Sequence, residues 1–301
     1  MHDPRRHIAI AARVITGATG TSRTILDHSR YLTGAGYRVT LMGEKLNRDR
    51  IAESGADSCQ IVPVKLGSKT KRMAFSLQVS WHAKWRRCDL VWGHGDNLDQ
   101  NFLSLHNCVH LAHELLYDAP LPTSSGVGMM HGKILRQAQF QKLIANSKLM
   151  AGEVIARFGV PSEKIGIVYP GYNPKQFNRH HRCSHAHEVR KSLHIPDGHK
   201  VIGLVTSGDF LKRGVSAFIG AIAKLEASLR EKTVALVIGK TDQKKQLMDL
   251  AESLGVKSRI RILPPTPQVE KFYHALDLLV HPARIEEFGQ VVQEGIMCGT
   301  P

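Results

Sequence analysis

Two glutamates near the end of the chain, Glu286 and Glu294, have the spacing that most directly suggests chemistry. They stand eight positions apart, around a Phe288-Gly289 turn and the start of a predicted helix. Glu286 would lie at the carboxyl end of a predicted strand, where α/β proteins bind their ligands. The amides of Phe288 and Gly289, with the helix dipole, could receive an anion, and Glu294 could accept hydrogen bonds from a diol such as ribose. Either glutamate alone would be typical of an exposed surface, so the indication comes from the pair in this setting.

Histidines are the next candidates for chemistry. His106 and His110 stand four positions apart and could ligate a metal, but no third ligand follows at a suitable spacing. Glu114 does not complete a His-Glu-x-x-His pattern. The histidines at positions 180, 181, 185 and 187, with Cys183, offer soft ligands but fall in a predicted linker. No Asp-x-Asp motif occurs, so a metal-bound nucleotide is not expected.

A glycine-rich loop from Thr16 to Thr21 follows the first predicted strand and opens a helix, as in dinucleotide-binding proteins. Glu44 lies near the end of the next strand, in keeping with that hypothesis. The fingerprint, however, needs a third small residue where Arg23 stands. A short-chain dehydrogenase would also need a Tyr-x-x-x-Lys pair, and the chain has none. An NAD(P)-binding oxidoreductase is therefore an alternative rather than our main hypothesis.

The elements that would position these residues alternate between strand and helix in two series. The first series has strands at 7–15, 37–42, 88–92 and 165–169, and helices at 24–34, 131–146 and 148–158. The second has strands at 201–206, 234–238, 260–263 and 278–281, and helices at 216–229, 243–254, 269–276 and 290–297. Strands separated by helices indicate parallel sheets, so we predict two doubly wound α/β domains that face a cleft.

The predicted domains span residues 1–178 and 196–301, joined by a polar, histidine-rich linker at 179–195. The last residues, Cys298-Gly-Thr-Pro301, stand where a doubly wound domain would enter its next strand. We therefore expect the second domain to be incomplete and the sequence to be a fragment.

Composition narrows the class of protein. The 301 residues are 42% hydrophobic, too apolar for a disordered chain, and no run is long and apolar enough to predict a membrane span or a signal peptide. The five cysteines are scattered and never form a Cys-x-x-Cys pair, which is typical of reduced thiols. These features predict a cytoplasmic protein.

The charge excess of +15 is densest between Ile61 and Cys88, where seven basic residues meet no acidic one. Trp81 and Trp85 lie within this segment. Such a stretch could rest on an anionic bilayer surface, or it could be a solvated helix whose tryptophans face the core. No nucleic-acid recognition motif accompanies the charge, so a nucleic-acid partner is not expected.

The stretch from Glu286 to Glu294 resembles the Glu-x7-Glu signature of family 4 retaining glycosyltransferases, which have the GT-B fold of two facing Rossmann-like domains. Further similarities run along most of the chain. They are Thr19-Gly20-Thr-Ser-Arg23 (a Gly-Gly-x-x-Arg loop), 32–39 (a helix-to-strand passage), 164–173 (a Lys-Ile…Pro-Gly segment) and 208–215 (a phosphate-binding turn). Positions 204–301 look most similar to the lipopolysaccharide core glucosyltransferases.

The resemblance implies roles on the donor side. Lys212 and Arg213 would neutralise the departing diphosphate of UDP-glucose, although the family usually has lysine directly before the glycine, where Arg213 stands. Glu294 would bind the ribose. Glu286, Phe288 and Gly289 would lie near the hexose, and Gly208 would belong to the phosphate-binding turn.

On the acceptor side, the resemblance places Gly20 near the substrates and His106 as the strand-end histidine that faces the donor sugar. The lipopolysaccharide core enzymes carry aspartate where this chain has Thr24. The implied reaction needs no metal and retains configuration by front-side departure and attack, with the leaving phosphate as base. The implied acceptor is a lipopolysaccharide core or another lipid-linked glycan. A non-catalytic sugar-nucleotide-binding remnant is a further alternative.

Overall fold

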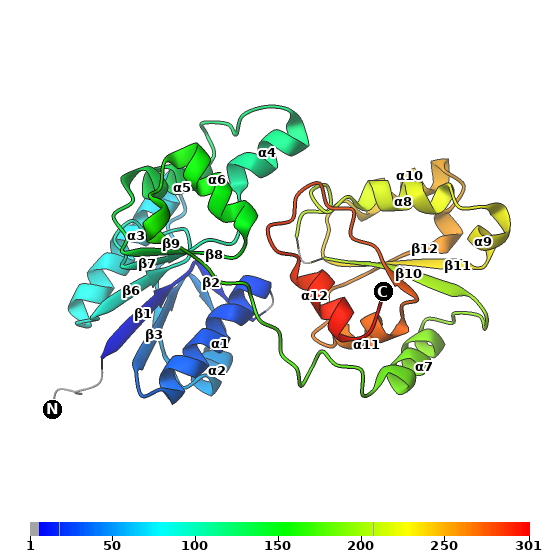
Figure 1. Cartoon of the computed structure of the whole chain (residues 1–301), viewed down its shortest axis with the longest axis horizontal. Helices are drawn as coiled ribbons and strands as arrows, with labels where there is room; N and C mark the ends of the chain where they lie inside the picture. Colours follow the sequence, from blue (N-terminus) through cyan, green and yellow to red (C-terminus); the bar gives the residue numbers. More distant parts are fainter. Residues whose placement is uncertain (1–5, 18, 207) are drawn as a thin grey trace. The chain divides into compact units, whose positions relative to one another are not determined.

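The computed structural model describes residues 6–17, 19–206 and 208–301. It divides into two compact units, Met1–Pro170 and Gly171–Pro301, each built around a sheet of its own (Figure 1). The division falls before the predicted boundary at residue 178. Both units consist of a parallel sheet with helices on its two faces, so the predicted doubly wound α/β architecture is confirmed for each.

Unit 1 has a seven-stranded parallel sheet with strand order β5-β3-β1-β6-β7-β8-β9. The strands are β1 (His7–Ala11), β3 (Arg38–Gly43), β5 (Asp57–Gln60), β6 (Leu90–Gly93), β7 (Phe102–Ser104), β8 (Lys142–Ala145) and β9 (Ile165–Ile167). A separate two-stranded ladder joins β2 (Val14–Ile15) to β4 (Lys45–Leu46). The order reverses between β1 and β6, and the crevice outside such a reversal is where α/β sheets bind ligands.

The helices of unit 1 cover both faces of this sheet (Figure 1). They are α1 (Gly20–Gly34), α2 (Arg48–Glu53), α3 (Ser68–Trp85), α4 (Val109–Tyr117), α5 (Gly126–Gln137) and α6 (Lys148–Phe158), with the short helix η1 (Ser162–Lys164). Strand β1 is buried along its whole length. Its residues Ile8 and Ile10 pack with α1, and Ala9 and Ala11 pack with α3, because successive side chains of a strand point to opposite faces.

The structure corrects two predicted elements of unit 1. The predicted strand 7–15 is interrupted after Ala11, and its last part pairs in the small ladder instead of the main sheet. The predicted helix 131–146 ends at Gln137, since Ala138 adopts the left-handed conformation that closes helices. The rest of that segment forms β8, which pairs with β7 on one side and β9 on the other.

Unit 2 has a four-stranded parallel sheet, β12-β11-β10-β13. The strands are β10 (Lys200–Val205), β11 (Thr233–Ile238), β12 (Ile260–Leu263) and β13 (Leu278–Leu279). The helices are α7 (Arg182–Ser192), α8 (Val215–Ala223), α9 (Ala227–Glu231), α10 (Lys244–Ser253), α11 (Val269–Ala275) and α12 (Gln290–Met297), with η2 (Lys257–Arg259). Strand β12 and helix α12 have the predicted bounds. The order reverses between β10 and β13, which gives this sheet its own switch point.

The segment predicted as a linker, 179–195, carries helix α7 and belongs to unit 2. Val189 of α7 is buried, and Arg190 donates to the carbonyl of Ala275 and the carboxylate of Asp277. The polar composition that suggested a linker is that of a helix with a narrow buried side. The predicted helix 216–229 is likewise two helices, α8 and α9, separated near Lys224.

Candidate functional site

Two loops of unit 2 bring five ionisable side chains together, which we call the charged cluster: Lys212, Arg213, His281, Glu286 and Glu287. The Nζ of Lys212 lies 2.8 and 3.0 Å from the two carboxylate oxygens of Glu287. Arg213 donates to Oε2 of Glu286, and Nε2 of His281 lies 2.8 Å from the same oxygen. The predicted site residues Lys212, Arg213 and Glu286 therefore do meet. Glu287 and His281 were missed, although Glu287 lies in the stretch from Glu286 to Glu294 and His281 ends the predicted strand before it.

The topology explains why these two loops meet. One loop follows β10 and the other follows β13, and these parallel strands are neighbours at the switch point. Gly214 has φ +70°, and a Cβ there would overlap the carbonyl oxygen of Pro282. Glycine thus lets the first loop rest directly on the second. Gly208, whose amide donates to Thr206 Oγ1 at 3.0 Å, lies against the Arg213 side chain.

Opposite charges determine the ionisation of Glu286. Burial by itself raises the pKa of this carboxyl, but the hydrogen bond from His281 and the positive charges of Arg213, His281 and Lys212 outweigh it, so the pKa is lowered. Glu286 is therefore ionised at neutral pH. Both of its contacts within the described residues use Oε2, which leaves Oε1 able to accept a hydrogen bond from a ligand.

Gly289 lies at the start of helix α12, and Glu294 lies within the helix. Gly289, with φ +87°, is the N-cap residue, so the free amides at the start of the helix follow directly after half-buried Phe288. Glu294 is only 5% exposed, and the hydroxyl of Tyr273 on α11 donates to its Oε2 at 3.0 Å. The carboxylate of Glu294 is therefore fixed in orientation and offers a ligand little surface.

In unit 1, side chains of helices α1 and α2 form hydrogen bonds to the glycine-rich loop. Gly20 is the first residue of α1, and Ser22 Oγ accepts from the backbone amides of Thr16 and Gly17 at 2.7 and 2.6 Å. Arg50 donates to the carbonyl of Gly17, and position 18 lies outside the described residues. The amides of Thr16 and Gly17, which could otherwise donate to a dinucleotide pyrophosphate, are therefore already bonded within the protein.

Glu44, the candidate ribose ligand of the dinucleotide hypothesis, is buried. Its Oε2 lies 2.9 and 2.7 Å from Nε and Nη2 of Arg13. A carboxylate held in this way is part of the fold and is poorly placed to receive a ribose, so the geometry disfavours the oxidoreductase alternative.

His106 follows β7 and is half-buried. Its Nε2 lies 2.8 Å from Nδ1 of His94, which follows β6. Burial, with a further contribution from His28, lowers the pKa of His106 to about 4, so the ring is neutral at physiological pH.

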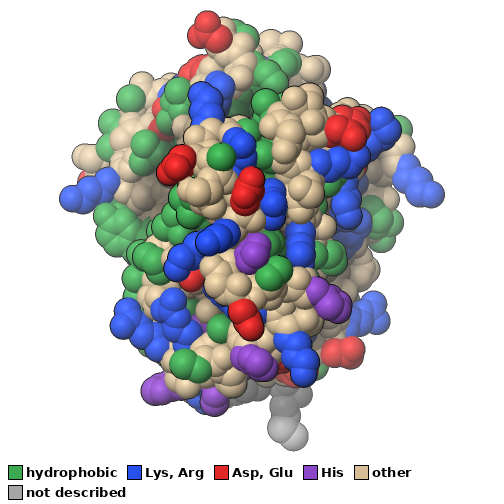
Figure 2. Space-filling model, turned by 90° about the vertical axis from the view of Figure 1, so that its right-hand side faces the viewer, with side chains coloured by type: hydrophobic (Ala, Val, Ile, Leu, Met, Phe, Trp, Pro, Cys, Tyr) green, Lys and Arg blue, Asp and Glu red, His purple; other side chains and the backbone are tan. Residues whose placement is uncertain are grey.

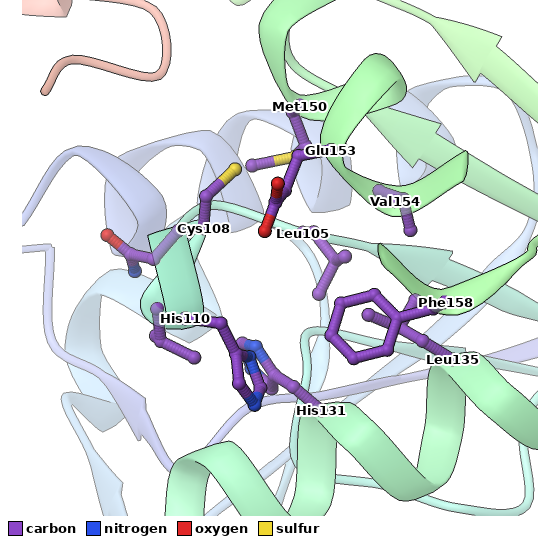
Figure 3. Close-up of a pocket in the computed structure, with 11 residues that line it drawn as sticks. Leu105, Cys108, His110, His131, Leu135, Met150, Glu153, Val154 and Phe158 are labelled. Carbon is purple, nitrogen blue, oxygen red and sulfur yellow. The ribbon is translucent and has the colours of Figure 1, made fainter. Parts of the chain in front are cut away.

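His110 faces a separate small pocket of unit 1, which Leu135, Phe158 and other apolar residues line (Figure 3). His110 and His131 both line it, and the ring of Phe158 lies 5.2 Å from that of His110. The pocket has room for about one water molecule, so a sugar nucleotide does not fit. His106 and His110 thus have different surroundings, and the described residues contain no group of three or more His, Cys, Asp or Glu side chains placed to hold a metal.

The basic segment 61–88 contains helix α3, and the structure decides where its tryptophans point. Trp81 and Trp85 are 62% and 67% exposed and stack on each other at 6.3 Å, with Leu77 exposed one turn earlier. The buried side of α3 consists of Phe75, Ser76, Val79 and Ala83. The interpretation that the tryptophans face the core is therefore wrong. Leu77, Trp81, Trp85 and the exposed cations Lys84 and Arg87 form what we call the α3 face.

On the face drawn in Figure 2, lysine and arginine side chains lie among acidic, apolar and uncharged ones, and histidines gather toward its lower edge. This pattern differs from the continuous basic stripe that is typical of nucleic-acid-binding surfaces. Within the described residues, no helix is long and apolar enough to cross a bilayer.

Comparison with protein families gives two matches that together cover most of the chain. Residues 18–176 match the model described as "Glycosyltransferase Family 4", and residues 186–301 match "Glycosyl transferases group 1". The first match alone covers more than half of the chain and includes all strands of unit 1 from β3 to β9.

Curated relatives carry glycosyltransferase names. The D-inositol 3-phosphate glycosyltransferase of Streptosporangium roseum is 30% identical over 236 residues, 74% of this chain and 50% of that protein. An uncharacterized glycosyltransferase of Methanocaldococcus jannaschii is 31% identical over 163 residues, 53% of this chain and 41% of that protein. The chain spans about half the length of the curated relatives it matches.

Solved structures agree in fold. WaaG, described as a glycosyltransferase involved in lipopolysaccharide biosynthesis, superimposes with a TM-score of 0.85 at 20% identity, over 98% of this chain and 80% of that chain. HepE of Anabaena, solved with UDP and glucose, gives a TM-score of 0.73 at 17% identity, over 99% and 80%. The predicted GT-B fold is confirmed.

Proposed function

Since this chain belongs to glycosyltransferase family 4, we propose that it is a retaining enzyme that moves a hexose from a UDP-sugar, glucose from UDP-glucose, to a glycan acceptor. The observation that supports this most strongly is the charged cluster. It sets two cations and an ionised carboxylate at the switch point of the unit 2 sheet, where a nucleotide sugar would bind.

Lys212 and Arg213 bind the donor diphosphate in this proposal. Each is already paired with a glutamate, but neither is saturated. Lys212 has three N–H donors and directs its ammonium at the two oxygens of Glu287, and Arg213 has five donors with one bond to Glu286. The remaining donors can bind phosphate oxygens, and they stabilise the negative charge that grows on the diphosphate as the glycosidic bond breaks.

Glu286 binds the hexose through Oε1, because Arg213 and His281 hold its other oxygen. Phe288 and Gly289 lie beside it at the start of α12, where backbone amides can donate to the sugar or to the phosphate. Glu294, whose carboxylate Tyr273 holds in a fixed orientation, is the proposed ligand of the ribose. Gly208 lies beside the Arg213 side chain, so its backbone is close to the diphosphate that Arg213 binds in this proposal.

The proposed transfer uses the leaving phosphate as the base that activates the acceptor hydroxyl, so no protein side chain is assigned that role and no metal is required. The acceptor lies on the unit 1 side, near Gly20 and His106. His106 follows β7 at the carboxyl edge of the unit 1 sheet, and Gly20 follows β2 of the small ladder.

The proposed acceptor is a lipopolysaccharide core or another lipid-linked glycan. Similarity to WaaG supports the first, and the α3 face supports either, since such an acceptor is presented at a membrane. Exposed tryptophans flanked by Lys84 and Arg87 suit an anionic bilayer surface. We accordingly propose a cytoplasmic enzyme that binds peripherally to the inner membrane through the segment from Ile61 to Cys88.

Ligand-dependent stabilisation tests the proposal. UDP and UDP-glucose should raise the Tm of the chain, whereas NADPH should leave it unchanged. Release of UDP from UDP-glucose in the presence of a heptose-containing lipopolysaccharide acceptor then tests transfer. Stabilisation by NADPH alone would favour the oxidoreductase, and binding of UDP without turnover would favour a sugar-nucleotide-binding protein.

A further inference from the structure

Four aromatic rings of unit 1 form a stack at the switch point of the sheet, which we call the histidine column: His28, Trp92, His94 and His106. Successive ring centroids lie 4.9, 5.9 and 5.1 Å apart, with interplanar angles of 17°, 22° and 3°. The rings come from α1, from β6 and the loop after it, and from the loop after β7. The column therefore places His94 directly against the residue that we assign to the substrates, His106.

Position and orientation of His94 are fixed independently of its hydrogen bond to His106. Its backbone amide donates to the carbonyl of Ala11 at 3.1 Å. Its ring lies along Trp92, whose indole Nε1 donates to Ser104 Oγ at 2.9 Å. A ring held at its backbone and along its face can set the orientation of a neighbour.

The hydrogen bond between the two histidines contains one proton. Both rings are neutral, because burial lowers the pKa of His106 to about 4 and that of His94 well below its usual range. A neutral imidazole has one N–H and one bare nitrogen, so either His94 Nδ1 donates to His106 Nε2 or the reverse holds. The tautomers of the two rings are therefore coupled.

The other nitrogen of His94 indicates the direction. His94 Nε2 is buried and has no hydrogen-bond partner among the described residues. If His94 accepted the hydrogen bond from His106, the proton of His94 would lie on its Nε2, as a buried N–H group without an acceptor. Buried N–H groups without an acceptor are rarer in proteins than buried acceptors without a donor. His94 is therefore the donor, and His106 holds its proton on Nδ1. That nitrogen has no hydrogen-bond partner among the described residues and is not enclosed.

We infer that His94 is a positioning residue: it keeps His106 in the Nδ1-protonated tautomer, so that His106 offers an N–H donor to a hydroxyl of the hexose or the acceptor. The second half of this statement rests on the proposed function, whereas the tautomer does not. A neutral donor of fixed orientation suits a glycan, whose recognition depends on hydroxyl groups instead of charge.

The tautomer is tested by ¹⁵N NMR of histidine-labelled protein at pH 7. In the wild type, the His106 resonances should show a protonated Nδ1 and a bare Nε2. His94→Phe keeps an aromatic ring in the column but removes the donor, so His106 should change toward the Nε2-protonated form. His28→Phe, at the other end of the column, is the matched control and should leave the His106 tautomer unchanged. A wild-type His106 protonated on Nε2, or a tautomer unaffected by His94→Phe, would overturn the inference.

Kinetics of the same variants test the consequence for transfer. His94→Phe should lower kcat about tenfold to a hundredfold with the KM for the UDP-sugar within about twofold. His94→Asn, whose side-chain amide can donate to His106, should recover most of the loss. If His94→Asn were as impaired as His94→Phe, hydrogen-bond donation by residue 94 would not be its role. An inactive wild type would refute the proposed function but leave the NMR result to decide the tautomer.

Discussion

In unit 2, the loops after β10 and β13 bring two cations against two carboxylates, whereas in unit 1 the loops after β6 and β7 bring together two histidines that burial keeps neutral. Both pairs of loops follow neighbouring parallel strands, and each group lies by the switch point of its sheet. The same place on two similar sheets thus carries ionised side chains in unit 2 and neutral histidines in unit 1.

This difference fits two kinds of ligand. A diphosphate needs cations with spare donors, and ion pairs keep such cations charged and oriented in a partly buried site. A glycan needs neutral donors and acceptors at fixed positions, and a charged histidine would bring a desolvation cost without an anion to meet. In the proposed function, the cations of unit 2 therefore meet the donor diphosphate and the neutral histidines of unit 1 meet uncharged hydroxyl groups, and substitutions in one unit should leave the role of the other unchanged.

The largest effect is expected from removal of both cations of the charged cluster. Lys212→Ala with Arg213→Ala should weaken UDP binding by about 3 kcal/mol or more, because each cation supplies charge-assisted hydrogen bonds to the diphosphate. Isothermal titration calorimetry measures this directly. Lys245→Ala on α10, an exposed partner of Asp249, is the control and should bind UDP as the wild type does. Unchanged affinity in the double variant would remove the diphosphate from this cluster.

Breaking one ion pair should cost folding stability as well. Glu287 is 3% exposed, so Glu287→Gln leaves the Lys212 ammonium partly buried without its counter-charge and should lower the free energy of unfolding by about 3 kcal/mol. Chemical denaturation measures the loss. The matched control is Glu252→Gln, which breaks an exposed pair with Lys257 and should change stability by less than about 0.5 kcal/mol. Equal effects of the two substitutions would show that the buried pair adds nothing.

Acid should affect the two units differently. Since burial lowers the pKa of His106 to about 4 and that of His131 to about 3, the unfolded state binds more protons than unit 1 does below pH 6.5. The stability of unit 1 is then fully present above pH 6.5 and falls by about 1.4 kcal/mol per pH unit for each such histidine, down to about pH 4.

The pKa of Glu286 is lowered instead, so its contribution to unit 2 is present above pH 4.5 and is lost only below that value. Burial also lowers the pKa of His274 in unit 2. This histidine therefore makes unit 2 lose some stability as the pH falls below 6.5, before Glu286 is protonated. Hydrogen exchange at pH 7 and pH 5 compares the units: amides of β6 and β7 should lose more protection than those of β10 and β11. Equal losses in the two sheets would contradict the contrast in charge.

The sequence predicted the charged cluster better than the histidine column, and topology explains why. Lys212 and Glu286 follow two strands that were both expected, and β12 and α12 were predicted to the residue. Strand β7 was not expected, because it has three residues and follows β6 without an intervening helix. His94 directly follows β6, which was expected, but its contact with His106 depends on β6 and β7 being neighbours.

Local conformation accounts for other differences. The choice of Glu287 as the partner of Lys212, with Glu286 taken by Arg213, depends on the side-chain directions of two adjacent residues in an irregular loop. The early end of α5 depends on a left-handed Ala138, an uncommon conformation for alanine. Neither follows from hydrophobic periodicity, which specifies the buried side of an element and not the conformation of a loop or a cap.

The smallest effect is expected at the α3 face, which tests whether unit 1 handles its acceptor at a membrane. Lys84→Gln with Arg87→Gln should weaken binding to vesicles that contain anionic lipid by about 2 kcal/mol, since each cation near such a surface contributes about 1 kcal/mol. Vesicle sedimentation measures this, and binding should fall as salt rises because the attraction is screened.

Trp81→Ala with Trp85→Ala should also weaken binding, but with little change in its salt dependence. Lys244→Gln with Lys245→Gln on α10 is the charge-matched control and should bind as the wild type does. If both charge variants lost equal affinity, the protein would respond to net charge alone, and the α3 face would have no particular role at the bilayer.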